Sequence, residues 1–193
     1  MILIDDQIQE YTPEEIARWT DELPEWRRKQ VLAYKNDMGR RQSLLAYRLL
    51  CQGLREEYGI MEQPTFVYNE HGKPSLALPP TGGDGEGLYF SLSHCKEGVC
   101  CAISDRPVGI DIESASRKIS DSVIRYSMNE GEQVLIRESD DPQRTFLRLW
   151  TQKEAVLKRL GTGIRDDMRG ILSDYAYTIE VRENERYILS VAW

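Results

Sequence analysis

The pattern of apolar positions predicts helices in the first third of the chain. The clearest stripe, with spacings of three and four residues, lies between about residues 40 and 58 and consists of Leu44, Tyr47, Cys51, Leu54 and Tyr58. A shorter helix should begin after Thr12, which is followed by a proline at the first helical position and by two acidic residues. Another should run from Pro24 to about residue 34.

The middle of the chain has the composition and the turn residues of β-strands. We expect strands at 65–68 and 88–94, separated by a loop at 79–87 that is rich in glycine and proline and should be mobile. Two further strands, at 99–104 and 108–113, follow after short turns. Such turns predict that consecutive strands pair with one another as an antiparallel meander.

Helical patterns return in the last third. Helices are expected at about 118–127, 129–138 and 142–160, and a C-terminal hairpin is expected from strands at 174–182 and 186–193. Runs of helices that alternate with runs of strands indicate the α+β class rather than a parallel α/β sheet. The length of 193 residues fits one domain, or two small halves that share a core.

The composition indicates the cellular compartment and argues against zinc and disulfide sites. The first eleven residues are acidic and lead into no apolar run, and no window approaches the roughly 20 apolar residues of a membrane span, so we expect a cytoplasmic protein without membrane contact. The four cysteines form no C-x-x-C pair, which argues against a structural zinc site or a disulfide framework. Adjacent Cys100 and Cys101 should point to opposite faces of a sheet and serve as packing residues.

The charge is unevenly distributed. The net charge of −7 argues against nucleic acid as a partner. Residues 18–55 nevertheless hold nine lysines and arginines against four acids, so this segment carries +5 and the remainder −12. A basic region on an acidic protein suits a small polyanion or an acidic protein partner, although solvated helix faces would give the same count.

Two carboxylates stand on one face of a predicted strand in the segment Gly109-Ile-Asp-Ile-Glu113. Asp111 and Glu113 project to one side, whereas the two isoleucines enter the core on the other side. Like charges at this spacing repel unless water or a cation separates them, and magnesium takes one or two carboxylates together with waters or phosphate oxygens. A half-buried strand with a solvated polar face is the plain alternative.

A second group of charges lies on the predicted helix at 142–160. Trp150, Glu154 and Lys158 fall on one line along the helix, and Lys153 lies beside it. The functional interpretation makes Glu154 a third metal ligand and the lysines phosphate contacts. The alternative is an ordinary surface pair, since a glutamate four residues before a lysine stabilises a helix by about 0.2–0.5 kcal/mol.

Two shorter motifs could contact phosphate. In Phe90-Ser-Leu-Ser-His94 a strand ends in a hydroxyl and an imidazole, and in the turn Gly72-Lys73-Pro74 a lysine has fixed backbone surroundings. Ser93 and His94 are neighbours whose side chains diverge in a strand, so they do not form a Ser-His-Asp triad. A structural histidine and a solvated lysine are the alternatives.

The order and spacing of these four motifs resemble the 4′-phosphopantetheinyl transferases, and in particular the long, monomeric class typified by the surfactin-synthetase activator. The resemblance spans roughly residues 40–160, and its specific parts are the G-I-D-I-E strand and the W-x-x-K-E-x-x-x-K helix about 40 residues later. It implies one α+β domain made of two similar halves in pseudo-twofold arrangement, roughly 1–107 and 108–193, with coenzyme A in the cleft between them.

The resemblance also implies the chemistry. A monomeric, magnesium-dependent holo-carrier-protein synthase would move 4′-phosphopantetheine from coenzyme A to a serine of an apo acyl or peptidyl carrier protein and release 3′,5′-ADP; manganese is an alternative ion. Asp111, Glu113 and Glu154 would hold the metal, Lys158 would contact the α-phosphate and Lys153 would lie near the reacting phosphates. The proton of the serine could pass to Glu154 or to a water on the metal.

The nucleotide end of coenzyme A has its own implied contacts. Lys73, Ser93 and His94 would bind the side that carries the 3′-phosphate. The family also uses a basic residue at the start of the long N-terminal helix, for which Arg41 or Arg40 is the counterpart, with Gln42 as the competing position. Thr151 and Cys95 stand where the family often has serine. A non-catalytic relative that binds coenzyme A or a carrier is the alternative function, and the carrier's pathway and the use of acyl-coenzyme A stay open.

Overall fold

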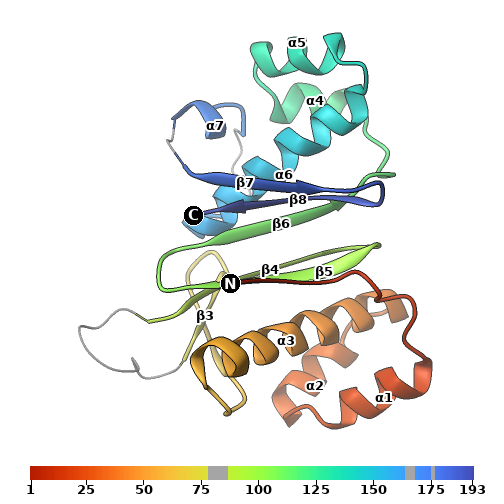
Figure 1. Cartoon of the computed structure of the whole chain (residues 1–193), viewed down its shortest axis with the longest axis vertical. Helices are drawn as coiled ribbons and strands as arrows, with labels where there is room; N and C mark the ends of the chain where they lie inside the picture. The colour runs from red at the N-terminus through yellow and green to blue at the C-terminus, as the bar shows by residue number, and fades with distance from the viewer. Residues whose placement is uncertain (78–86, 164–167, 175–176) are drawn as a thin grey trace.

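The computed structural model describes residues 1–77, 87–163, 168–174 and 177–193 (Figure 1). The predicted loop at 79–87 lies outside the described residues except for its last position. Helices and small antiparallel sheets make up the chain, and the predicted α+β class is confirmed. Among the described residues, no helix combines the length and the apolar character needed to cross a bilayer.

In the first half, residues 1–77 and 87–107 form three helices and five strands. In chain order they are β1 (Ile2–Asp5), α1 (Pro13–Asp21), α2 (Glu25–Leu32), α3 (Asp37–Tyr58), β2 (Phe66–Tyr68), β3 (Pro74–Leu76), β4 (Tyr89–Cys95) and β5 (Gly98–Ser104). Helix α1 begins at a capping box between Thr12 and Glu15, as its sequence predicts, and α3 ends at Gly59 in the left-handed conformation. The short strands β1 and β3 were not predicted.

The second half holds four helices and three strands among its described residues. They are β6 (Gly109–Ser114), α4 (Asp121–Ser127), α5 (Glu130–Glu138), α6 (Pro142–Leu160), α7 (Ile171–Asp174), β7 (Ile179–Glu183) and β8 (Tyr187–Ala192). The bounds of α6 agree with the predicted 142–160, and β7 and β8 form the predicted hairpin. Strand β7 is shorter than expected, and the four-residue α7 was not predicted.

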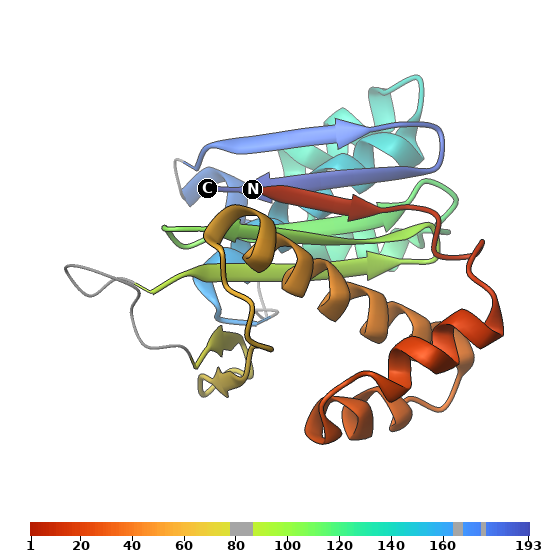
Figure 2. The same ribbon diagram turned by 60° about the horizontal axis from the view of Figure 1, so that its bottom comes forward.

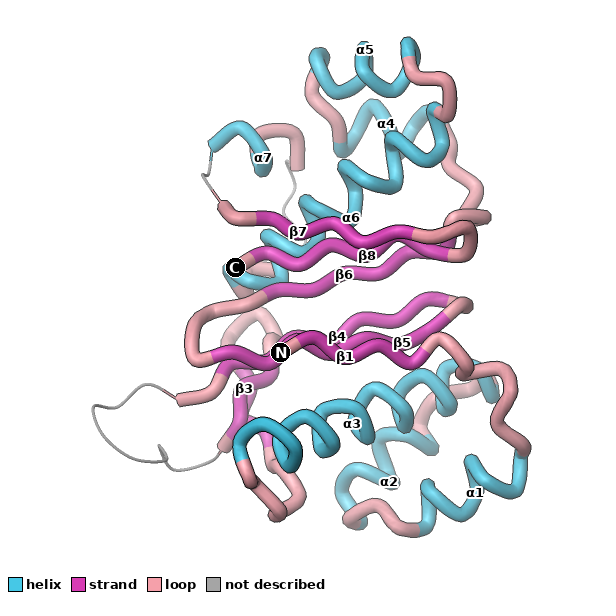
Figure 3. Tube along the Cα trace, in the orientation of Figure 1, coloured by secondary structure: helices cyan, strands magenta, loops and turns pink. Residues whose placement is uncertain are grey.

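The elements stack in four layers, helix on sheet on sheet on helix (Figures 1 and 3). One sheet has the strand order β1-β5-β4 and packs against α3, and the other has the order β6-β8-β7 and packs against α6. Besides the apolar clusters between each sheet and its helix, another apolar cluster lies between the two sheets and includes Ile110, Ile112 and Leu189. Cys101 faces α3 and Cys100 faces the other sheet, so the adjacent cysteines do point to opposite faces.

The predicted meander is only half right. Strands β4 and β5 form an antiparallel hairpin, but β5 does not pair with β6. The other edge of β5 is taken by β1, in a register from Ile2 opposite Ala102 to Asp5 opposite Val99, and β6 pairs with β8 instead. Short turns predict pairing between neighbours only where no distant strand competes for the same edge. Here β1, the first strand, pairs with the free edge of β5, and β8, the last strand, pairs with β6.

Hydroxyl groups join the two sheets where β4 and β6 meet. The backbone N–H of Ile110 donates to Ser91 Oγ at 3.1 Å, and that of Ile112 donates to Ser93 Oγ at 3.4 Å. These contacts replace a ladder of backbone bonds and satisfy buried donors at the edge of β6. In Figure 2, α3 crosses in front of the strands of the two sheets. The junction positions the candidate site.

Candidate active site

A cavity of about 260 Å³ lies where β4, β6 and α6 meet. It is lined by Leu92, Ser93, His94, Asp111, Glu113, Trp150, Glu154 and Lys158. The lining comes from three of the four predicted motifs and from both halves of the chain. The three predicted metal ligands therefore line one cavity, although Glu154 lies far from Asp111 and Glu113 in the sequence.

Glycine at the start of β6 allows the strand to approach α6 closely. A Cβ atom at Gly109 would overlap the carbonyl oxygen of Ala155 and the backbone nitrogen of Arg159, both in α6. Neither backbone atom can move without disturbing the helix, so a larger residue does not fit. This contact brings the acidic face of β6 against the helix face that carries Glu154 and Lys158.

Asp111 lies at the centre of the site. Its Oδ1 atom accepts hydrogen bonds from Lys158 Nζ at 2.7 Å and from Ser93 Oγ at 2.8 Å, and Lys158 Nζ also donates to Ser93 Oγ at 2.7 Å. The Asp111 side chain is 8% exposed, and its other oxygen, Oδ2, is buried without a hydrogen-bond partner. An unpaired oxygen on a buried carboxylate costs free energy, because it has lost its hydrogen bonds to water and has gained no hydrogen bond within the protein.

The neighbouring carboxylates have raised pKa values. Burial and then the charge of Asp111 raise the pKa of Glu113, against the opposing effects of Arg117 and Lys158. Burial and the charge of Asp111 also raise the pKa of Glu154 to about 7. Burial lowers the pKa of Lys158, but the charge and the hydrogen bond of Asp111 outweigh it, so the net direction is upward. Burial and the repulsion from Asp111 therefore both disfavour the charged forms of Glu113 and Glu154.

Arg117 belongs to this site although the sequence analysis missed it. Its guanidinium pairs with Glu113 and lies over the ring of Trp150, with Cζ 4.8 Å from the ring centroid. The indole Nε1 of Trp150 is itself buried without a partner. No sequence signal separates Arg117 from its neighbours, because it follows β6 in an irregular segment where side-chain direction has no periodicity.

A second cavity, of about 320 Å³, adjoins the first and shares Leu92, Glu154 and Lys158 with it. Its other walls come from the β2–β3 turn and from the end of α6. Lys73 lies in this wall, and its Nζ donates to the carbonyl of Arg159 at 3.0 Å, while Asn69 Nδ2 donates to the carbonyl of Gly161 at 3.0 Å. The turn of the first half is thus fastened to the last turn of α6, where carbonyls have no partners within the helix.

The chain is similar in sequence to known proteins. Residues 107–189 match the family described as the 4′-phosphopantetheinyl transferase superfamily. The chain is 31% identical over 141 residues to the 4′-phosphopantetheinyl transferase gsp of Aneurinibacillus migulanus, an alignment that covers 72% of this chain and 56% of that protein. Residues 107–189 belong to that superfamily, and the chain as a whole is similar to its members.

Other transferases of this superfamily match at similar levels. Identity is 34% over 128 residues to psf-1 of Bacillus pumilus, covering 64% of this chain and 52% of that protein. It is 32% over 101 residues to Sfp of Bacillus subtilis, covering 51% and 42%. The chain spans about half the length of the curated relatives it matches. The superfamily match contains Asp111, Glu113, Glu154 and Lys158, but not the motifs around Lys73 and His94.

The position of Lys153 corrects the expectation that it lies near the reacting phosphates. Its side chain is 0% exposed, and Nζ contacts Glu132 at 2.7 Å and donates to the carbonyls of Ser127 and Met168 at 2.8 and 3.0 Å. It does not line the cavity of Asp111. One residue along a helix changes direction by about 100°, so Lys153 and Glu154 face different neighbours.

Arg41 is also displaced from its expected place. Its guanidinium donates to the carbonyls of Ile8 and Tyr11 at 2.6 and 2.7 Å and so holds the segment before α1 against α3. Arg40 and Arg41 line a different cavity, between α1, α2 and α3. Of the three positions considered, only Gln42 touches the site strand, because its Nε2 donates to the carbonyl of Cys95, next to His94, at 2.8 Å.

The donor set fits a divalent ion, although no ready-made cage exists. Among the described residues, no three histidine, cysteine, aspartate or glutamate side chains gather closely enough to enclose a metal. Magnesium needs only one or two carboxylates and completes its shell with waters and phosphate oxygens. The buried, unpartnered Oδ2 of Asp111 is a free ligand atom of this kind. Glu113 and Glu154 face the same cavity, with pKa values raised by burial and then by the Asp111 charge.

Proposed function

We propose that this chain is a magnesium-dependent holo-carrier-protein synthase that acts as a monomer in the cytoplasm. It transfers 4′-phosphopantetheine from coenzyme A to a serine hydroxyl of an apo acyl or peptidyl carrier protein and releases 3′,5′-ADP. The observation that carries the proposal is the cavity in which three carboxylates, one of them with a buried and unpartnered oxygen, meet the lysine of the W-x-x-K-E-x-x-x-K helix. The named activity of the relatives supports the same reaction.

The proposed magnesium ligands are Asp111, Glu113 and Glu154. The bound ion would neutralise charge on the pyrophosphate of coenzyme A, and manganese would serve in the same way. Lys158 adds a fixed positive charge at the same point, held by Asp111 and Ser93 at 2.7 Å from each. Phosphoryl transfer is catalysed mainly by alignment and by stabilising charge on the phosphate oxygens, and a partly buried lysine held in a fixed position supplies both.

The second cavity is the proposed site for the nucleotide end of coenzyme A. Its walls combine apolar side chains, among them Phe90 and Leu157, with the cationic Lys73. Burial lowers the pKa of Lys73, and the nearby Arg159 lowers it further, so an added phosphate would relieve a strained charge. His94, on the first cavity, is the proposed partner of the 3′-phosphate. The shared residues of the two cavities let one extended ligand occupy both.

The direct test combines the purified chain, coenzyme A, magnesium and a panel of apo carrier proteins from fatty-acid, polyketide and peptide synthesis. We expect at least one carrier to gain the mass of one phosphopantetheine on its serine, detected by intact-protein mass spectrometry, and none to gain it when magnesium is chelated. A known transferase run in parallel shows that each carrier is competent. Failure of every carrier in that setting would refute the proposal.

A single charge removal tests the metal site. Glu113→Gln should lower the rate of transfer by about a hundredfold, as for loss of one charge-stabilising group. Near-normal turnover of this variant at limiting magnesium would remove Glu113 from the metal site. Tight binding of coenzyme A without any transfer by the wild-type chain would favour the alternative of a non-catalytic binding relative.

A further inference from the structure

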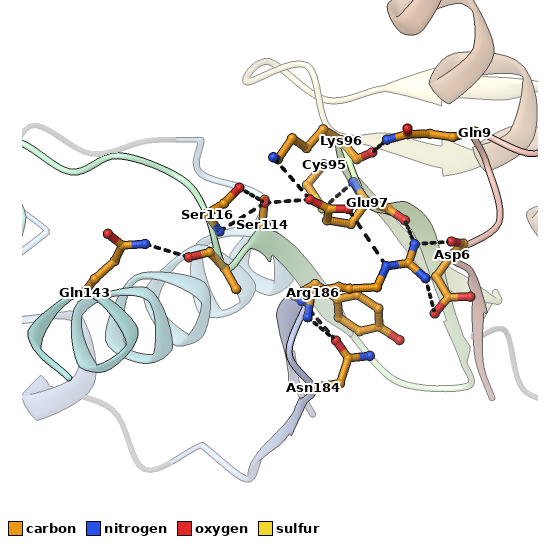
Figure 4. A network of polar contacts seen from close by, with 12 residues as sticks. Asp6, Gln9, Cys95, Lys96, Glu97, Ser114, Ser116, Gln143, Asn184 and Arg186 are labelled. Atoms are coloured by element: carbon orange, nitrogen blue, oxygen red, sulfur yellow. Dashed lines mark hydrogen bonds and ion pairs between the residues drawn. The ribbon is translucent and has the colours of Figure 1, made fainter. Parts of the chain in front are cut away.

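A network of polar side chains joins the two sheets immediately beside the candidate site (Figure 4). It involves the β4–β5 turn, the end of β6 and the β7–β8 turn, which belong to both halves of the chain. Glu97, in the β4–β5 turn, lies at its centre, and Figure 4 shows this side chain between Ser114 and Arg186. None of these residues lines the cavity of Asp111.

Glu97 connects one half to the other directly. Its Oε1 atom accepts a hydrogen bond from Ser114 Oγ at 3.0 Å and lies 3.3 Å from Lys96 Nζ. Its Oε2 atom lies 3.9 Å from the Nε of Arg186. The Glu97 side chain is 17% exposed, so these contacts are only partly screened by water.

Arg186 completes the connection from the C-terminal hairpin. Its guanidinium donates to the carbonyl of Glu97 at 3.2 Å and to the carbonyl of Asp6, just beyond β1. The backbone of the turn is fixed, because Asn184 Oδ1 accepts from the N–H of Arg186 at 2.8 Å and from that of Tyr187 at 3.0 Å. The network therefore ties the β7–β8 hairpin to one end of the opposite sheet, where β1 ends and β4 turns into β5.

The connected positions are adjacent to two candidate site residues. Ser114 directly follows Glu113 on β6, and Glu97 is three residues after His94, in the turn that ends β4. His94 and Glu113 stand in different sheets, and β4 and β6 share no backbone ladder. No regular pairing fixes their separation, which is set by the apolar layer between the sheets and by polar contacts, namely those of the junction serines and the network around Glu97.

We propose that Glu97 is a positioning residue that sets the separation of His94 and Glu113 by clamping the β4–β5 turn to Ser114 and Arg186. The inference rests on the proposed function, since it assigns these two residues to one ligand, the nucleotide end and the metal end of coenzyme A. The clamp holds the two sheets in the spacing that this ligand bridges.

The test compares Glu97→Ala with Glu183→Ala as a matched control. Glu183 also pairs with two arginines, Arg144 and Arg148, but all three lie in the second half and away from the cavity. We expect Glu97→Ala to weaken coenzyme A binding about tenfold in calorimetry, in the range typical for residues that orient ligand-binding groups. Glu183→Ala should change it less than twofold, and Glu97→Gln, which keeps an acceptor for Ser114, should restore most of the affinity.

Hydrogen exchange gives a readout that is independent of activity. The amides of Ile110 and Ile112, which donate to the junction serines, should exchange faster in Glu97→Ala than in Glu183→Ala at equal global stability. If wild-type protein binds coenzyme A but transfers nothing, the proposed function fails while both readouts still test the clamp. If wild-type protein binds no coenzyme A, exchange alone decides. Equal coenzyme A affinity or equal exchange in the two alanine variants would overturn the proposal.

Discussion

Helix α6 carries two lysines, five residues apart, that each pair with a buried carboxylate, and the two pairs differ in completeness. Lys153 is fully enclosed, and its Nζ contacts Glu132 and several backbone carbonyls. Glu132 in turn accepts from the N–H of Asn129 at 2.8 Å in a capping box. On the other face, the Lys158 side chain is 30% exposed, and its partner Asp111 has an oxygen with no partner.

This difference distinguishes a structural pair from the pair to which we assign a function in the proposed reaction. A buried ion pair stabilises a fold only where hydrogen bonds satisfy the remaining donors and acceptors, and the Lys153 pair meets that condition. The Asp111 pair does not, and two further carboxylates with raised pKa values face the same cavity. A site that binds a cation and a polyanion must leave such atoms unsatisfied until the ligands arrive. The unpartnered atoms thus lie on the face of α6 where we propose that the ligands bind.

The largest expected effect comes from breaking the complete pair. Lys153→Met should lower the free energy of unfolding by about 3–5 kcal/mol, because Glu132 and buried carbonyls lose their partner. Urea denaturation followed by circular dichroism measures it. The double variant Lys153→Met/Glu132→Gln should recover part of the stability and, with it, the transfer activity. A double variant that is stable but inactive would indicate that Lys153 contacts the phosphates, and it would contradict the structural role assigned to the Lys153–Glu132 pair.

Breaking the incomplete pair should affect activity more than folding. Lys158→Met should reduce carrier modification about a hundredfold, since it removes a fixed charge from the reacting phosphates. Its loss of unfolding free energy should be smaller than that of Lys153→Met, because Lys158 is partly solvated and Asp111 keeps its bond from Ser93. Parallel assays of initial rate and urea denaturation compare the two variants. Equal stability losses would mean that the two lysines serve one structural role.

The raised pKa of Glu154 predicts a stability that depends on pH in the metal-free protein. The folded pKa of about 7 lies above the ordinary value of 4.5, so the folded state holds the proton more tightly than the unfolded chain. Stability from this group is therefore lost as the pH rises from about 4.5 to about 7. Glu154→Gln should raise the Tm by a few degrees at pH 8 and leave it unchanged at pH 4. A gain of the same size at both pH values would exclude the charge as its cause.

The smallest effect is expected on a third face of α6. Thr151 is 0% exposed, and its Oγ1 shares a 2.8 Å hydrogen bond with Ser190 Oγ in β8. Thr151→Val should cost about 1 kcal/mol of unfolding free energy, because the buried serine hydroxyl loses its partner. Thr151→Ser, which keeps the hydroxyl, is the matched control. Transfer activity should stay near normal in both, and a large loss of rate would extend the functional face of α6 to Thr151.

The sequence alone determined the α+β class, the family and most of the element bounds. Periodicity and caps act within a few residues, so α1, α6 and the C-terminal hairpin could be read directly from them. The acids of β6 and the line of Trp150, Glu154 and Lys158 on α6 followed from the same local geometry. What a strand or a helix places on one face is a property of its own residues.

Only the tertiary structure decided which of these faces meet. Strand β5 pairs with β1 rather than with β6, because edge partners are chosen by packing across the whole chain. Lys153 and Arg41 were assigned to ligands by resemblance, yet Lys153 is held by carbonyls and the Glu132 carboxylate, and Arg41 by two backbone carbonyls. Arg117 and Glu97 carried no sequence signal, since each acts through contacts with a different sheet or helix. Long-range packing determines such contacts, and the charge or the spacing of a residue does not encode its distant partner.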